Sequence, residues 1–459
     1  MMARARVQAM ILGAGLGTRM KSAVPKVLHD VLGHPMVWYV VDAVRGLDAS
    51  PVLVIPPGND AFREVFGESV LYAEQPQRLG SGHAVRCGMD RVTAEYVLIC
   101  NGDNPLPSSH DYEEFVDACL AEGATAGVLS ADLADPRSLG RIIRDESGGF
   151  TRIVEARDAT PAELAVREIN TGIYFFRTEE LRRCLAELRP ENAQGEYYIT
   201  DCLGMAMRDG TGVSCHASSD RWELVGINDR SELAAATRLL QARKQEALFA
   251  GGVTIDLPET VRVDWDVTVE ADSEIRQGSC LRGATRVGRA CIIGPNSTLI
   301  DASVGDGARV VASYVEASHI GSGCVVGPFS YIRPGTTTGK QSKVGAFCEL
   351  KATTLGAGSK IPHLSYIGDA TIGENVNIGA GTITCNYDGF TSEKHRTVIE
   401  KDAFIGANNN LVAPVTVHEG AYTATGSTIT HDVPPGSLGI ARAVQVDKEG
   451  WVRRKKHGQ

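Results

Sequence analysis

The sequence predicts an α/β unit with a mostly parallel sheet, followed by a left-handed parallel β-helix of hexapeptide repeats. Three observations support this prediction. The chain has 459 residues, more than one hydrophobic core usually supports. Its first half alternates short apolar runs with helix-like segments. Its second half places an apolar side chain at every sixth position.

The apolar runs of the first half predict the strands of the sheet. They cover residues 7–12, 51–55, 96–99 and 172–176, with helix-like segments between them. In open sheets of this kind the ligand site lies at the carboxyl ends of the strands. We therefore expect the functional residues of this half just after these runs.

A single helix is predicted to connect the two halves, over residues 229–251. Asp229 and Glu232 are typical of a capping box at its start, and Gly251 and Gly252 of its end. We therefore expect one domain at residues 1–228 and a second at residues 252–459, the latter ending in a C-terminal tail.

From about residue 252 the sequence acquires a period of six, with glycine after many of the apolar residues. This pattern is the signature of a hexapeptide-repeat β-helix, in which three hexads make one triangular coil. Such helices have flat faces that often pack as trimers, so we expect a homotrimer. The repeated positions include Val269, Ile275, Leu281, Val287 and Ile293, then Ile320, Val326, Ile332, Thr338, Val344 and Leu350, and later Ile399, Ile405, Leu411, Val417, Thr423 and Ile429.

Composition argues against several classes of protein. The net charge of -10 comes from dispersed acidic residues, and the one basic run, residues 453–456, is typical of a solvated tail, so no nucleic-acid partner is expected. None of the eleven cysteines belongs to a Cys-x-x-Cys pair, which predicts free thiols in a reducing compartment. No apolar run is long enough to span a bilayer. We therefore expect a cytoplasmic protein without a membrane partner.

A glycine-rich loop after the first apolar run carries the first candidate site. Gly13, Gly15 and Gly17 allow backbone N–H groups to approach a phosphate or a base. The loop matches neither a Gly-x-Gly-x-x-Gly fingerprint nor a Walker A loop. Arg19 and Lys26 follow it and supply the positive charge that a bound triphosphate requires.

Together with the motifs downstream, this loop resembles the signature of sugar-nucleotide pyrophosphorylases. The chain resembles bifunctional N-acetylglucosamine-1-phosphate uridylyltransferase/glucosamine-1-phosphate acetyltransferases. That resemblance implies a Rossmann-like nucleotidyltransferase domain and an enzyme that makes UDP-N-acetylglucosamine from small-molecule substrates. The motifs, in family order, are Gly-x-Gly-Thr-Arg-Met with Pro25-Lys26, then Gln75, Leu79-Gly-Ser-Gly-His-Ala84, Asn101-Gly-Asp-Asn-Pro105, Gly140-Arg141, Glu155, Asn170-Thr-Gly172, the segment from Asn192 to Asp201, and Gly226-Ile-Asn228.

The same resemblance implies roles for residues of the first half. Asp103 and Asn228 would hold Mg²⁺, and Arg19 and Lys26 would be catalytic. The oxygen of the sugar phosphate would attack the α-phosphorus of UTP, a reaction that requires positioning and charge neutralisation but no protein nucleophile. The residues implied to bind UTP or UDP-N-acetylglucosamine are Leu12, Gly13, Ala14, Gly15, Lys26, Gln75, Gly80, Ser81, Asn101, Gly102, Asp103, Gly140, Glu155, Asn170 and Asn228.

Three of these positions depart from the common family pattern. Leu16 stands where lysine is frequent, Ser81 where threonine is usual and Asn101 where tyrosine or serine is usual. The first departure removes a positive charge near the phosphates, so we expect it to affect the rate and not the reaction.

Spacing alone predicts an anion site in the β-helix. Arg333 and Lys351 are 18 residues, or three hexads, apart. They should therefore lie on one face at the rung spacing of a β-sheet, about 4.8 Å. Two stacked like charges are unfavourable unless an anion lies with them. His363 and Asn386 are near in the coil count, and Glu349 is close enough to orient the imidazole of His363.

These residues again resemble the acetyltransferase half of the same family, in Arg333-Pro-Gly335, Glu349-Leu-Lys351, His363-Leu-Ser-Tyr366 and Asn377-Ile-Gly-Ala380. The resemblance implies that His363 is the base that deprotonates the amine of glucosamine 1-phosphate for attack on the thioester of acetyl-CoA. It also implies two sets of ligand-binding residues. Arg333, Lys351, Tyr366, Asn377 and Lys394 would bind the sugar phosphate, and Ala380, Asn386, Tyr387, Ala407, Thr425 and Arg442 would line the acetyl-CoA site.

Two positions of the acetyl-CoA set differ from the usual family residues. Ala407 stands where serine is usual, and Thr425 where alanine is usual. Because Ala407 has no hydroxyl group, we expect a weaker contact with the thioester.

Two other interpretations stay open. The chain could be a sugar-1-phosphate nucleotidyltransferase whose β-helix only regulates or oligomerises, or a non-catalytic scaffold that keeps this pair of domains. Asp103, Arg19 and Lys26 argue against the scaffold. A purely structural β-helix would not need the set of Arg333, Lys351, His363 and Asn386.

Overall fold

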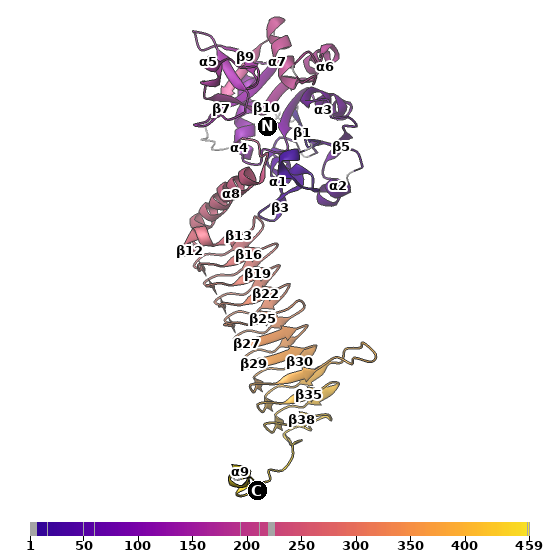
Figure 1. Cartoon of the computed structure of the whole chain (residues 1–459), viewed down its shortest axis with the longest axis vertical. Helices are drawn as coiled ribbons and strands as arrows, with labels where there is room; N and C mark the ends of the chain where they lie inside the picture. The colour runs from indigo at the N-terminus through magenta and orange to yellow at the C-terminus, as the bar shows by residue number, and fades with distance from the viewer. Residues whose placement is uncertain are drawn as a thin grey trace. The chain divides into compact units, whose positions relative to one another are not determined.

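The structure, a computed structural model, describes residues 7–15, 17–48, 50–58, 60–192, 194–210, 212–218, 225–456 and 458. Contacts divide the chain into two compact units, Met1–Leu240 and Gln241–Gln459 (Figure 1). The division falls within helix α8 (Arg230–Ala250). At the start of α8, the carboxylate of Asp229 accepts hydrogen bonds from the N–H groups of Ser231 and Glu232, each at 2.9 Å. Leu16 lies outside the described residues.

The first unit is built on a sheet with the strand order β11-β7-β10-β6-β1-β4-β5. Strand β1 (Val7–Leu12) pairs in parallel with β4 (Val52–Ile55) and β6 (Tyr96–Asn101), and β4 pairs in parallel with β5 (Leu71–Glu74). The apolar runs predicted β1, β4 and β6 but not β5. The carboxyl ends of β1 and β6 are adjacent, because Leu12 is the register partner of Asn101.

Along this strand order, one strand runs against the others. Strand β10 (Glu168–Arg177) is antiparallel to both of its neighbours, β6 and β7 (Ala126–Asp132), while β11 (Val213–Ala217) is parallel to β7. The chain reaches β10 through an antiparallel pair, β8 (Arg141–Arg144) and β9 (Phe150–Val154), where a parallel strand would need a crossover. The apolar run at residues 172–176 predicted this strand but not its direction.

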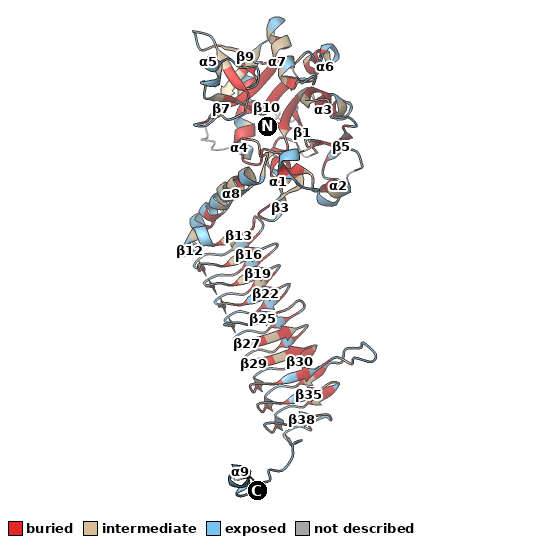
Figure 2. Ribbon diagram, viewed as in Figure 1, coloured by how far each residue is buried: buried red, intermediate tan, exposed pale blue. Residues whose placement is uncertain are grey.

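Helices cover both faces of the sheet. Successive strand residues point to opposite faces, so one strand contributes side chains to a hydrophobic cluster on each side. Ala9 and Ile11 of β1 pack in one hydrophobic cluster with α1, α2 and α4, while Met10 packs in a second cluster with α3, α6 and α7. The strands are accordingly buried (Figure 2). The helices of this unit are α1 (Met36–Val44), α2 (Asp60–Phe66), α3 (Ser81–Gly88), α4 (Ser109–Ala121), α5 (Pro161–Leu164), α6 (Thr178–Glu187) and α7 (Ile199–Arg208), with short 3-10 turns at Thr18–Met20, Lys26–Leu28 and Met89–Arg91 and a two-stranded ribbon of β2 (Asp30–Val31) and β3 (His34–Pro35).

The second unit is the predicted left-handed parallel β-helix, in which short strands stack coil upon coil on three faces. The first face contains β12 (Thr254–Ile255), β15 (Glu274–Ile275), β18 (Ile292–Ile293), β21 (Arg309–Val310), β24 (Val325–Val326), the first parts of β27 (Lys343–Lys351) and β29 (Lys360–Gly368), β31 (Asn377–Ile378), β34 (Phe404–Ile405), β37 (Tyr422–Thr423) and β39 (Leu438–Gly439). The second face contains β13 (Arg262–Val263), β16 (Cys280–Arg282), β19 (Thr298–Ile300), β22 (Tyr314–Glu316), β25 (Tyr331–Ile332), the second parts of β27 and β29, β32 (Ile383–Cys385), β35 (Asn410–Val412) and β38 (Thr428–Ile429). The third face contains β14 (Thr268–Val269), β17 (Arg286–Val287), β20 (Ser303–Val304), β23 (His319–Ile320), β26 (Thr337–Thr338), β28 (Thr354–Leu355), β30 (Ala370–Ile372), β33 (Thr397–Ile399) and β36 (Val415–Val417).

The side chains at every sixth position fill the interior of this β-helix as one hydrophobic cluster. Ile332, Leu350 and Ile367 follow one another in register and are completely buried. The coils stack so closely that some corners require glycine. An ideal Cβ on Gly345 would lie 1.9 Å from the carbonyl oxygen of Pro362 in the next coil. The chain then ends in a short helix, α9 (Trp451–Lys456).

Two further expectations concern thiols and membranes. All eleven cysteines are free, as the sequence predicted. Among the described helices, none combines the length and hydrophobicity that crossing a bilayer requires.

The buried column predicts that Ile367→Ala destabilises the β-helix. Because Ile367 is completely buried in the cluster, its truncation should cost about 2–5 kcal/mol of unfolding free energy. Guanidinium unfolding measures this cost, with Thr354→Ala, an exposed strand position, as the control. Equal unfolding midpoints for the two variants would contradict the assigned interior.

Candidate functional site

The first candidate site lies where β1 and β6 end, and two adjoining cavities of about 410 and 700 Å³ form it. Ser81, Asn101 and Asp103 line both cavities. Of the other residues expected in this site, the smaller cavity is lined by Leu12, Ala14, Gly15, Lys26, Gln75 and Gly80, and the larger one by Arg19, Gly140, Glu155, Asn170 and Asn228.

Two expected residues, Gly13 and Gly102, line neither cavity. Their N–H groups donate to the backbone carbonyls of Val54 and Leu12, at 2.8 and 2.9 Å. The first bond holds the glycine-rich loop to β4, and the second holds the segment after β6 to the end of β1. Both glycines therefore fix the backbone around the site.

Asp103, Asn228 and Lys26 meet at the centre of the site. The ammonium group of Lys26 is buried and contacts the carboxylate of Asp103, and it donates to Oδ1 of Asn228 at 3.2 Å. Two oxygen atoms from distant parts of the chain are thus directed at one cation. Mg²⁺ prefers such oxygen ligands and completes its shell with water and substrate phosphates, so this donor set fits the metal that the sequence implied.

Gly80 and Ser81, which line the smaller cavity, contact the segment at the start of α7. Gly80 has φ +103°, and an ideal Cβ on it would lie 2.5 Å from the carbonyl oxygen of Tyr197, so both conformation and space require glycine. Ser81 Oγ accepts from the N–H of Ile199 at 3.1 Å. Gln75 donates to the carbonyl oxygen of Gly80 at 3.2 Å. Serine at position 81 thus keeps a hydroxyl contact despite its departure from the family pattern.

Glu155, Asn170 and Gly140 lie together in the larger cavity. The N–H of Asn170 donates to the carbonyl oxygen of Gly140 at 2.9 Å, and its side-chain amide donates to the hydroxyl of Tyr174 at 2.8 Å. Burial raises the pKa of the Glu155 carboxyl, and the negative charges of Asp158 and Asp201 raise it further. The cavity therefore contains a carboxylate that protonates more readily than an exposed glutamate.

Sequence reasoning missed two cations among the described residues of this site, Arg78 in the smaller cavity and Arg157 in the larger one. Arg78 lines the smaller cavity, and its Nε donates to the carbonyl oxygen of Ala14 in the glycine-rich loop at 2.9 Å. Its position in the sequence between Gln75 and Gly80, two expected binding residues, could have identified Arg78 as a further residue of the site.

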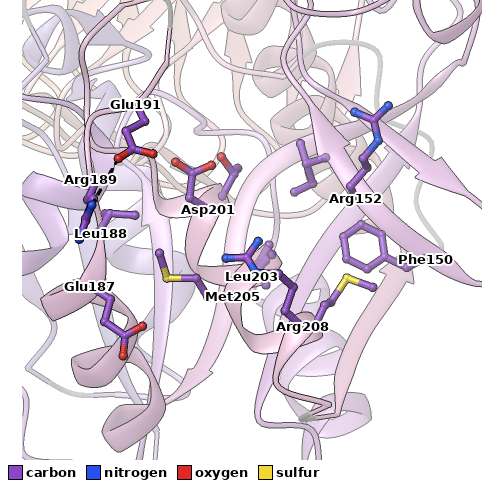
Figure 3. A pocket seen from close by; sticks show the side chains of 14 residues that line it. Phe150, Arg152, Glu187, Leu188, Arg189, Glu191, Asp201, Leu203, Met205 and Arg208 are labelled. Atoms are coloured by element: carbon purple, nitrogen blue, oxygen red, sulfur yellow. Dashed lines mark ion pairs between the residues drawn. The ribbon is translucent and has the colours of Figure 1, made fainter.

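A third cavity, of about 400 Å³, lies beside α7 and contains none of the expected binding or catalytic residues (Figure 3). Arg152, Asp201 and Arg208 are among the charged residues that line it, and Thr200 lines this cavity as well as the larger cavity of the site. The start of α7 therefore separates the two. Burial raises the pKa of Asp201, and the charge of Arg208 opposes that shift.

The second candidate site lies on the β-helix, where the register aligns Arg333 with Lys351. Ile332 pairs with Leu350, and the N–H of Arg333 donates to the carbonyl oxygen of Leu350 at 2.8 Å. Arg333 and Lys351, the residues that follow Ile332 and Leu350, therefore lie on successive rungs, as the 18-residue spacing predicted. Lys351 pairs in turn with Gly368.

The structure gives Glu349 a different partner from the one that the sequence suggested. Its Oε1 accepts from the guanidinium of Arg333 at 2.7 Å, and this contact raises the pKa of Arg333. Within the described part of the chain, no hydrogen bond joins Glu349 to His363. The reason is the register, since Glu349 is paired with Tyr366, three residues beyond His363. Glu349 therefore holds Arg333.

His363 shares one corner of the β-helix with three expected acetyl-CoA residues. The register pairs Lys360 with Asn377, Asn377 with Phe404, and Phe404 with Tyr422. Three residues further along, these four coils carry His363, Ala380, Ala407 and Thr425, which we call the corner column. Successive rungs are about 4.8 Å apart, so the four residues of the column follow one another along this corner, beginning at His363.

Tyr366 and Asn386 are brought together beside Lys351. An ideal Cβ on Gly368 would lie 2.4 Å from the hydroxyl of Tyr366 and 2.8 Å from Nδ2 of Asn386, so both groups cover this glycine. Asn386 begins a loop that returns through an antiparallel bridge between Tyr387 and Lys394. Both bridge residues are exposed.

Two expected residues, Asn377 and Arg442, do not lie beside Tyr366 and Asn386 within one chain, whereas the bridge to Tyr387 keeps Lys394 on the loop that begins at Asn386. Asn377 lies on the first face, six residues before Ile383, whose partner on the second face is Tyr366. Arg442 is exposed and follows Ala441, whose carbonyl oxygen accepts from Thr428. Lys394 is exposed on the loop. One chain therefore presents the expected residues on more than one face.

Comparison with known proteins defines first the class of the chain. Residues 9–251 match the family model of the MobA-like NTP transferase domain, and this domain precedes the hexapeptide β-helix. The chain is 45% identical to the "Bifunctional protein GlmU" of Heliobacterium modesticaldum, with 98% of each chain covered, and 45% identical to that of Brevibacillus brevis at the same coverage. It is 44% identical to that of Mycolicibacterium vanbaalenii, over 98% of this chain and 93% of the relative.

At such identity over nearly the whole length, the chain belongs to the family of bifunctional GlmU proteins.

The raised pKa of Glu155 predicts a pH-dependent affinity for the expected sugar phosphate. As pH falls through this raised pKa, the carboxylate that accepts hydrogen bonds from sugar hydroxyls is lost, so KM should rise at a less acidic pH than for an exposed glutamate. Glu155→Gln should show a KM about tenfold higher at neutral pH and a flatter profile on the acid side. Glu146→Gln, at an exposed site, is the control. The same acid limb in Glu155→Gln as in the unmodified enzyme would contradict this assignment.

Proposed function

We propose that the chain makes UDP-N-acetylglucosamine by two successive transfers, acetyl transfer to glucosamine 1-phosphate and then uridylyl transfer to N-acetylglucosamine 1-phosphate. Two observations carry the proposal, the alignment of His363 with the corner column and the stacking of Arg333 on Lys351 along the second face. A β-helix that only regulates or oligomerises needs no base and no pair of stacked cations at this place.

The first unit would carry out the uridylyl transfer. Arg19, Lys26 and Arg78 supply positive charge for the triphosphate, and the glycine-rich loop presents backbone N–H groups beside them. Glu155 and Asn170 hold the sugar, so its phosphate oxygen can approach the α-phosphorus of UTP in line with the leaving pyrophosphate. Asp103 and Asn228 would hold Mg²⁺, which when bound neutralises charge that develops on the phosphates.

The β-helix would carry out the acetyl transfer. Arg333 and Lys351 bind the phosphate of glucosamine 1-phosphate, which directs its amine toward His363. The imidazole accepts a proton from the amine while the new C–N bond forms, and the C–S bond of acetyl-CoA then breaks. The proton passes to the CoA thiolate as it leaves. The corner column and Asn386 position the thioester.

The acetyl-transfer site would be completed by a second copy of the chain. Arg333, Lys351 and Tyr366 lie on the second face, whereas Asn377 lies on the first. Side chains that point outward from two faces of a triangular coil diverge. A homotrimer would bring the first face of one copy against the second face of its neighbour, so Asn377 of the neighbour would join the sugar-phosphate site. The domain boundaries at residues 228 and 252 and the cytoplasmic location stay predictions from the sequence.

Two substitutions should separate the two reactions. His363→Ala should slow CoA release by about 10²- to 10⁴-fold, because it removes the general base, and should leave pyrophosphate release unchanged. Asp103→Ala should abolish pyrophosphate release with UTP and leave CoA release unchanged. Both products are measured in one preparation of each purified variant.

The matched control is His319→Ala, an exposed histidine on the third face of the same β-helix. It should alter neither activity. CoA release by His363→Ala within about tenfold of the unmodified enzyme would remove His363 from the reaction, since a general base contributes more. Loss of both activities in one variant would indicate misfolding and would leave no selective role for the substituted residue.

A further inference from the structure

A carboxylate outside the expected site residues holds Asn386. Asp369 lies between β29 and β30, and its Oδ2 accepts a hydrogen bond from Nδ2 of Asn386. The register explains the pairing. Tyr366 is paired with Ile383, so the residues three positions further on, Asp369 and Asn386, occupy the same corner of successive coils.

Both partners are fixed through their backbones. The N–H of Asp369 donates to the carbonyl oxygen of Lys351 at 2.9 Å, and its own carbonyl oxygen accepts from Thr397 at 3.3 Å. The carbonyl oxygen of Asn386 accepts from His395 at 2.8 Å, and its side chain is only 6% exposed. Asp369 thus joins the lysine of the phosphate site directly to the asparagine of the acetyl-CoA site.

The chemistry of the pair fixes the orientation of the Asn386 amide. An ionised carboxylate only accepts hydrogen bonds, whereas a carboxamide donates from one end and accepts at the other. Asp369 therefore selects the orientation in which Nδ2 faces the β-helix, beside Gly368 and the hydroxyl of Tyr366. The amide oxygen must then point the other way. A neutral partner at position 369 would permit both orientations.

A second aspartate at the same kind of corner shows that this arrangement is not a general device of the fold. Asp301 has φ 49°, close to the 48° of Asp369, and its N–H likewise donates to the preceding coil, at Arg282. Its carboxylate, however, accepts a hydrogen bond from the backbone N–H of Ala284 in the preceding coil at 2.9 Å. At Asp369 the corresponding acceptor is directed at the side chain of Asn386 instead.

We propose that Asp369 is a positioning residue of acetyl transfer, which presents the Asn386 amide to the acetyl group of acetyl-CoA in one orientation. This inference rests on the proposed acetyltransferase function. It assigns Asp369 a role through Asn386 and none in binding the sugar phosphate.

The test is Asp369→Asn in the full chain. Asparagine keeps the size of the side chain and tolerates a left-handed backbone, so the coil should still form. Loss of the charged acceptor should raise KM for acetyl-CoA about tenfold, the effect expected for one hydrogen bond to a charged group. The KM for glucosamine 1-phosphate, pyrophosphate release and the unfolding midpoint should stay unchanged.

Asp301→Asn is the matched control and should leave both KM values unchanged. A double-mutant cycle adds a second measurement, because Asp369→Asn introduced into Asn386→Ala should change acetyl transfer by less than about twofold. Three results would overturn the proposal: an unchanged KM for acetyl-CoA in Asp369→Asn, equal changes in both KM values, or a further tenfold loss in the Asn386→Ala background. Failure of the unmodified enzyme to release CoA would instead overturn the proposed function.

Discussion

The stacking register of the β-helix determines which residues of the second site lie together within one chain. Each coil hydrogen-bonds to the next through its backbone, and the buried side chain at every sixth position keeps the coils in register. A shift of one residue would turn the interior positions outward. Ile332, Leu350 and Ile367 therefore do more than fill the core, since they place Arg333 and Lys351 on successive rungs. The same register places His363 at the start of the corner column and Asp369 beside Asn386 of the next coil.

A different constraint governs the first unit, where the carboxyl ends of neighbouring parallel strands meet. The pairing of Leu12 with Asn101 brings the glycine-rich loop and Asp103 together although they are far apart in sequence. Asn228, just before α8, completes the group through Lys26. Residues that have no common spacing can thus share a site because they follow adjacent strands or enter from a neighbouring segment.

Some of these arrangements could be predicted from the sequence and others could not. The period of six predicted the β-helix and the stacking of Arg333 on Lys351, because both depend only on residue counts. The partner of Glu349 was not predicted, because the coil count did not show that Glu349 is paired with Tyr366 and not with His363, or that its side chain turns back to Arg333 of the preceding coil. Asp369 lies at a corner with a positive φ, outside the apolar period, so it gave no periodic signal. The antiparallel direction of β10 was missed because an apolar run carries no direction.

The division of the acetyl-transfer residues between two faces is tested most directly by mixing two inactive chains. His363→Ala and Asn377→Ala would be co-expressed with different affinity tags and purified on both tags in succession. Each variant alone should release CoA slowly, whereas the mixed assembly should recover activity well above either, because some sites then combine an intact His363 of one copy with an intact Asn377 from a neighbour. Mixed assemblies that stay as inactive as the separate variants would contradict a site shared between copies.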